Sequence, residues 1–130
     1  MNIDRFTEKA QEAVASAQGI ATRFQHNEID AEHILLALLE QSEGLIPELL
    51  KKVGADPAVI HEQIQAGLAG RPRVTGGDSQ VYTSTRARQV LADAENQAKR
   101  FKDEYVSTEH LLLSILEHAG GAASRLAIAS

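Results

Sequence analysis

The chain has 130 residues, 43% apolar and 24% charged, which is enough for one hydrophobic core in an ordinary folded domain. A formal net charge of −5 argues against general binding of nucleic acid backbones, which requires a basic surface. The absence of cysteine excludes disulfides, thiolate metal sites and thiol nucleophiles. No apolar run approaches the roughly 20 residues of a membrane span and no signal peptide is recognisable, so we expect a cytoplasmic protein.

The first predicted helix covers residues 7–24, with Thr7 as its N-cap. Its apolar residues recur with the 3.6-residue helical period and are mostly small: Ala10, Ala13, Val14, Ala17, Ile20, Ala21 and Phe24. Asp30 is the expected cap of a second helix. Apolar residues leave this second helix almost no polar side, which is typical of a helix surrounded by other helices.

A short third helix is predicted for residues 45–53, and Gly54 is expected to end it in a left-handed turn. Asp56 and Pro57 are expected to open a fourth helix as cap and first helical residue. Residues 71–82 follow, begin with Arg-Pro-Arg-Val, and contain a glycine pair in a stretch without periodicity. They are predicted to be a linker.

After this linker the pattern restarts, because the sequence repeats itself 77 positions later, so that His33 corresponds to His110. Roughly a third of the paired positions are identical, without a gap from the pair Thr7 and Ser84 to the pair Gln41 and His118. Repeat one therefore covers residues 6–70 and repeat two residues 83–130, with Ser84 and Ser107 as the expected caps of its two helices. Residues 122–129 are expected to belong to an interrupted helix, so repeat two lacks a full counterpart of the fourth helix.

Together these motifs resemble the Clp N-terminal domain, the double four-helix module that opens the Clp chaperone ATPases. The matching segments are residues 6–10, 29–39, 54–57, 71–74 and 105–113. The resemblance covers essentially the whole chain, and the linker with its glycine pair is most similar to the ClpB disaggregase subfamily. It implies an all-α fold in which two copies of a four-helix unit are related by a pseudo-twofold axis.

The resemblance also implies a non-catalytic domain that binds unfolded or aggregated polypeptide and passes it to AAA+ ATPase rings. The alternative is an adaptor- and substrate-docking domain of a protease-coupled ClpC or ClpA unfoldase. A stand-alone helical scaffold and a small hydrolase are more distant alternatives. No G-x-x-x-x-G-K-[ST] loop occurs here, so ATP and magnesium are expected only in modules beyond this domain. We expect a monomeric domain within a hexameric full-length protein, with no nucleic acid or membrane partner.

Two acidic residues at equivalent positions, Glu32 and Glu109, are the first candidates for a binding site. Each lies near the start of a predicted helix, where the helix dipole stabilises a carboxylate by roughly 0.3–1 kcal/mol. They are either plain helix-start acids or acceptors for cationic groups of a bound chain, and resemblance to ClpC-type domains suggests arginine-derived groups. Thr7 and Ser84 would flank the same two positions, with simple N-capping as the alternative.

Resemblance to ClpB implies that Thr7, Asp103 and Glu109 together influence how a substrate engages. An unfolded substrate also exposes apolar side chains and needs an apolar groove. The expected groove wall consists of Leu91, Tyr105 and Val106, although Leu91 also fits the core.

Three polar residues depart from the more apolar pattern of some ClpB relatives and predict a more charge-guided groove: Asp93, Gln97 and His110. His33 and His110 lie in separate repeats without further ligands in a metal-binding pattern, so we expect them to support the first helical turn. No metal site is predicted, and no catalytic constellation either, because no Ser, His or Asp occurs in a recognisable catalytic context.

Overall fold

Six helices and two very short strands make up the computed structural model over the residues that it describes, 4–74 and 80–118. In chain order they are α1 (Glu8–Arg23), β1 (Glu28–Ile29), α2 (Ala31–Glu40), α3 (Leu45–Lys52), α4 (Pro57–Ala69), β2 (Tyr82–Thr83), α5 (Thr85–Arg100) and α6 (Thr108–His118). The predicted helical fold is confirmed. The strands escaped prediction because two residues cannot show an alternating pattern. The interrupted helix expected at residues 122–129 lies outside the described residues.

Local signals in the sequence set the helix ends. Thr7 Oγ1 accepts a hydrogen bond from the N–H of Ala10 at 3.2 Å, and Ser84 Oγ accepts the equivalent bond from Ala87 at 2.9 Å. These bonds satisfy backbone donors that have no partner within the first helical turn. Gly54 adopts a φ of +87° after α3, as its position predicts.

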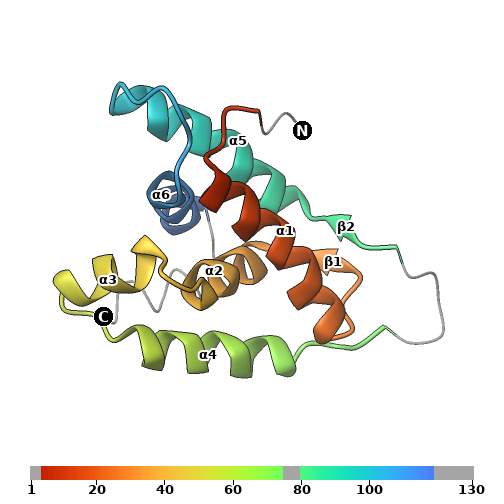
Figure 1. Ribbon diagram of the computed structural model, residues 1–130. Coiled ribbons are helices and arrows are strands. Elements are labelled where there is room, and N and C mark those ends of the chain that lie inside the picture. The colour runs from red at the N-terminus through yellow and green to blue at the C-terminus, as the bar shows by residue number, and fades with distance from the viewer. Residues whose placement is uncertain (1–3, 75–79, 119–130) are drawn as a thin grey trace.

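Helix α2 lies at the centre and packs against all five other helices (Figure 1). Every residue from 31 to 39 is buried, which explains the absence of a polar side. Alanines on α1, among them Ala10, Ala13 and Ala17, are fully buried, and their small side chains let α2 approach closely. Repeat two packs α5 on α6 as repeat one packs α1 on α2, and the core residues of both repeats form one cluster.

The first residues of each repeat pair with a segment of the other repeat. Phe6 at the start of repeat one forms a parallel bridge with Val106, which precedes α6, while strand β2 pairs in parallel with β1, which precedes α2. Thr83 and Ile29 are the residues at the positions equivalent to Phe6 and Val106, and they too are paired. This reciprocal pairing is what an approximate twofold axis between the repeats requires.

No helix in the part of the chain that the structure describes combines the length and apolar character of a membrane span.

Two glycines with different backbone conformations, Gly54 and Gly19, allow a test of the left-handed turn after α3. A Cβ at either Gly54 or Gly19 would meet nothing within 4 Å, but only Gly54 has a positive φ, whereas Gly19 lies inside α1. We expect Gly54→Ala to lower the free energy of unfolding by about 1 kcal/mol and Gly19→Ala to raise it by about 0.5–1 kcal/mol. Urea denaturation measures both. Equal effects of the two substitutions would contradict the assigned left-handed turn.

Candidate functional site

Helices α1 and α5 end in the same way and thereby place equivalent residues, His26 and Asp103, against the next helix. Gln25 and Lys102 take φ values of 59° and 60°, and the backbone N–H groups of His26 and Asp103 each donate back into the preceding helix at 2.8 Å. The chain therefore turns sharply after α1 and again after α5. As a result, the side chain of His26 faces the first turn of α2, and the side chain of Asp103 faces the first turn of α6.

The conserved spacing of the two repeats brings a histidine to each of these side chains. The N–H groups of Asp30 and Ser107 donate to Nδ1 of His33 and His110 at 2.8 and 2.9 Å, which confirms the predicted role of both histidines in the first turn. Because Nδ1 accepts, the proton of each neutral imidazole lies on Nε2. His33 Nε2 then donates to His26 Nδ1 at 2.9 Å, whereas His110 Nε2 donates to Asp103 Oδ2 at 2.8 Å.

Glu109 carries a negative charge at the start of α6. Its Oε1 accepts a hydrogen bond from Ser107 Oγ at 2.8 Å, and its side chain is half-buried. Within residues 4–74 and 80–118, no cationic side chain forms an ion pair with it. Asp103 lies nearby with a half-exposed carboxylate, so this end of repeat two presents two acidic groups to the surroundings.

Glu32, the counterpart of Glu109, has a very different environment. It is only 4% exposed, and Arg71 binds its carboxylate while also lying 3.4 Å from Asp30 Oδ2. Arg86 Nη1 lies 3.8 Å from Glu32 Oε1. The chain thus supplies its own arginines to this acidic pair, and Glu32 is engaged inside the fold.

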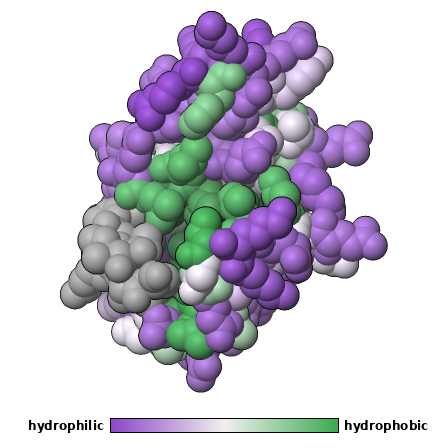
Figure 2. Space-filling view, turned by 90° about the vertical axis from the view of Figure 1, so that its left-hand side faces the viewer, coloured by the Kyte–Doolittle hydropathy of each residue, from purple (hydrophilic) through white to green (hydrophobic). Residues whose placement is uncertain are grey.

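A groove of about 450 Å³ runs beside Glu109, between α3 and α6. Its lining combines the two acids with apolar and aromatic side chains: Leu49, Phe101, Asp103, Glu109, His110, Leu112 and Leu113. Figure 2 shows hydrophobic residues gathered into a patch on this side of the molecule, where α3 and the connection between α5 and α6 lie. Phe101 lines the groove and is 57% exposed.

The structure separates the side chains that were expected to form the groove wall. Leu91 and Val106 are 6% and 2% exposed and belong to the core, so a bound chain could reach them only after local opening. Tyr105 is exposed. Thr7 and Ser84 cap α1 and α5, and Ser84 also donates to Asp30 Oδ1 at 3.2 Å, which places it beside the Glu32 cluster.

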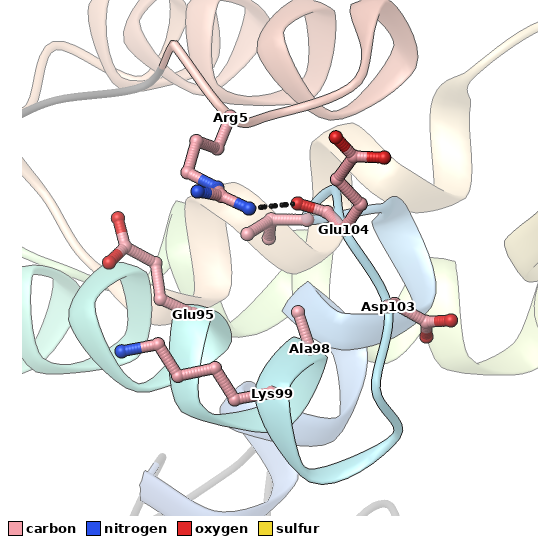
Figure 3. A pocket seen from close by; sticks show the side chains of 7 residues that line it. Arg5, Glu95, Ala98, Lys99, Asp103 and Glu104 are labelled. Atoms are coloured by element: carbon pink, nitrogen blue, oxygen red, sulfur yellow. Dashed lines mark hydrogen bonds between the residues drawn. The ribbon is translucent and has the colours of Figure 1, made fainter.

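A second hollow, of about 300 Å³, lies on the other side of Asp103, and most of the residues that line it carry charged groups. Arg5 donates to the backbone oxygen of Glu104 at 2.8 Å there, and Glu95 and Lys99 line the opposite wall (Figure 3). The carboxylate of Asp103 points away from this hollow (Figure 3), and its Oδ2 accepts a hydrogen bond from Nε2 of His110. Asp103 therefore contributes its charge to the apolar groove rather than to the charged hollow.

Sequence reasoning missed most of the apolar lining and the arginine at Glu32. The repeat predicts a core position for Phe101, because it is the counterpart of Phe24, which is packed against the core, yet 57% of Phe101 is exposed. Leu113 is half-buried although its counterpart Leu36 is fully buried. The exposure of Phe101 and Leu113 differs from that of their counterparts Phe24 and Leu36 only in the folded structure. The amino-acid sequence carries no signal for this difference.

Comparison with known proteins agrees with this architecture. Residues 5–128 match the family described as the Clp repeat (R) N-terminal domain, and the chain belongs to that family. Chaperone protein ClpB of Nitratidesulfovibrio vulgaris is 45% identical over 120 residues, which cover 90% of this chain and 14% of that protein. The chain thus spans about a seventh of the length of such relatives.

Solved structures share the fold. The Hsp104 N-terminal domain from Candida albicans superimposes with a TM-score of 0.80 at 22% identity, covering 95% of this chain and 87% of that one. A ClpV N-domain in complex with VipB peptide has a TM-score of 0.72 at 21% identity, covering 90% and 71% of the two chains.

The buried histidine pair predicts a loss of stability in acid. Burial, and then the charge of His26, lower the pKa of His33 to about 4, against an opposing effect of Asp30. The unfolded chain therefore binds a proton more readily, so stability is fully present above pH 6.5 and is lost as the pH falls toward 4. His33 contributes roughly 3 kcal/mol at most to this loss. The difference in unfolding free energy between the wild type and His33→Asn should shrink over this window, and a pH-independent difference would contradict the assignment.

The buried contact between Arg71 and Glu32 predicts an unequal response to charge removal. Arg71→Ala should lower the free energy of unfolding by about 2–3 kcal/mol, because it leaves a buried carboxylate with only Arg86 nearby. Adding Glu32→Gln should recover part of that loss. The control is Lys51→Ala, which removes an exposed pair with Glu48 and should change stability by no more than about 0.5 kcal/mol. Similar losses for Arg71→Ala and Lys51→Ala in thermal or urea unfolding would refute the buried pair.

Proposed function

We propose that this chain is the substrate-recruiting N-terminal domain of a ClpB-like, ATP-dependent protein disaggregase. Unfolded polypeptide would bind in the groove between α3 and α6, and the AAA+ rings to which the domain is attached would supply ATP hydrolysis. The observation that carries the proposal is an apolar groove with two acidic groups, Asp103 and Glu109, of which Glu109 lacks an ion-pair partner within the described residues.

The groove offers what distinguishes an unfolded chain from a folded one. An unfolded client exposes apolar side chains, and covering them with Phe101, Leu112 and Leu113 removes apolar surface from water on both partners. The groove is small and open, so it can accept a few side chains at a time without selecting one sequence. A domain that passes a bound polypeptide to the ATPase rings must release it readily, so weak and transient binding suits this role.

Charge adds a preference to this apolar contact. The net charge of the chain is −5, and the groove itself carries the two carboxylates of Asp103 and Glu109. Clients with lysine or arginine beside an apolar residue would therefore be attracted more strongly than neutral or acidic clients. Glu32 has no such role in this proposal, because Arg71 and Arg86 already neutralise it. Of the two equivalent acids, only Glu109 is proposed to meet a client.

Similarity to named proteins supports the proposal at the level of the whole protein. The ClpB relatives are chaperones, and a ClpV N-domain of the same fold is described in complex with a peptide. A role in capturing polypeptide segments for a hexameric ATPase is the simplest activity that fits these relatives and the open groove.

Titration of isotope-labelled chain with a permanently unfolded protein tests the proposal. We expect NMR shifts confined to the groove, and about tenfold weaker binding after Phe101→Ser, which removes a large apolar contact. Tyr82→Ser is the matched control, because Tyr82 is similarly exposed (53% against 57%) but lies on β2. Equal effects of the two substitutions, or shifts spread evenly over the surface, would refute the groove as the binding site.

A separate measurement tests the proposed preference of the groove for clients with cationic side chains. Glu109→Gln should weaken binding of a lysine- and arginine-rich unfolded client more than binding of a neutral client, and the difference should fade as salt rises. Unchanged discrimination between the two clients would leave Glu109 without a role in recognition.

A further inference from the structure

A second group of side chains, apart from the groove, gathers three residues of the kind that bind metal ions. Asp93 on α5 and Glu117 and His118 on α6 each offer one ligand atom, and these atoms all lie within 4.8 Å of one another. His118 Nε2 is 2.9 Å from Asp93 Oδ2. Glu117 lies eight residues beyond Glu109 on α6, about 12 Å along the helix, so this group is separate from the groove.

A buried amide holds the two carboxylates together. Gln97 is only 1% exposed, and its Nε2 donates to Asp93 Oδ2 at 3.2 Å and to Glu117 Oε2 at 2.9 Å. Burying an amide between helices costs free energy unless its hydrogen bonds are satisfied. Here the carboxylates of Asp93 and Glu117 accept those bonds. The cluster of polar side chains therefore extends from the surface into the interface of α5 and α6, where the buried Gln97 closes it.

The carboxylate of Asp93 has three hydrogen-bonding neighbours: Asn96, Gln97 and His118. Burial on its own would raise the pKa of Asp93, but hydrogen bonds from Asn96, Gln97 and His118 outweigh it and lower the pKa below its ordinary value. Asp93 is therefore ionised at neutral pH. Arg100 offsets part of the charge on Glu117 only weakly, because its Nη1 lies 3.5 Å away and both side chains are exposed.

The same position in repeat one serves as an internal comparison. The residues equivalent to Asp93, Gln97, Glu117 and His118 are Ser16, Ile20, Glu40 and Gln41. Of the three ligand positions, only one holds a potential ligand in repeat one, namely Glu40. The buried Gln97 is replaced there by Ile20, which is 4% exposed. The helix pair common to both repeats therefore does not require the polar group, which is a feature of repeat two alone.

We propose that Asp93, Glu117 and His118 form a site for a divalent transition metal ion of the zinc class, with water in the remaining positions. Two carboxylate oxygens and an imidazole nitrogen suit zinc better than calcium or magnesium, which prefer oxygen ligands alone. Two ligands at about 2.1 Å around a tetrahedral ion lie about 3.4 Å apart, so the Asp93–His118 pair needs to open only slightly. The ion would replace the proton between them and clamp the last turn of α6 to α5.

Isothermal titration of the metal-free chain with zinc chloride, and cobalt absorption as an independent readout, test this site. We expect one-to-one binding, tetrahedral cobalt bands, and at least about tenfold weaker binding after His118→Gln or Asp93→Asn. Both variants change side chains that are not fully buried, so the fold should persist, and circular dichroism checks this. Binding should also weaken in acid, because protons compete for the ligands.

Glu40→Gln is the matched control. Glu40 occupies the position of Glu117 in repeat one and lies 2.8 Å from His61, where a stray ion could bind. The control should leave zinc affinity unchanged. Absence of saturable binding would overturn the proposal. So would affinity that survives His118→Gln, or that falls as much after Glu40→Gln.

Discussion

Reciprocal pairing of the repeats determines how everything else in this domain is positioned. The N–H of Thr7 donates to Val106, and the N–H of Ser84 donates to Ile29, each at 2.9 Å. Each repeat therefore has its first residues fixed on the segment that precedes the central helix of the other. These bonds fix the segments that precede α1, α2, α5 and α6, so the starts of these four helices are positioned by contacts between the two repeats.

Within this nearly symmetric frame, equivalent positions have acquired different environments. Glu32 is buried against arginines of the linker and of α5, whereas Glu109 faces an open groove. The residue that meets the first-turn histidine is His26 in repeat one and Asp103 in repeat two. Removing an arginine from the buried pair would leave a buried charge without its partner, whereas the half-buried Glu109 has no ion-pair partner within the described residues. The two copies of the repeat thus differ in the surroundings of their equivalent acids, which is why the proposed binding site lies in repeat two alone.

The sequence predicted the elements well because their signals are local. Caps such as Thr7 and Ser84 act within one helical turn, and the apolar period of α1 reports its buried face directly. The same reasoning correctly assigned His33 and His110 to the first turns of their helices. It could not distinguish Glu32 from Glu109, because the two residues occupy equivalent positions near the start of a helix, one in each repeat. It also missed the group of Asp93 and His118, whose members are joined only where α5 packs on α6.

Over the described residues, the sequence by itself determined the order of the helices, the duplication and four helix caps: Thr7, Asp30, Asp56 and Ser84. Each of these features is encoded within a few neighbouring residues or by direct comparison of the two copies. Only the tertiary structure decided which surfaces are available. Arg71 meets Glu32 across 39 positions of the chain, and the groove is assembled from α3 and from the region around α6. Exposure and ion pairing depend on which distant segments lie together, and that depends on the packing of the whole chain rather than on any local pattern.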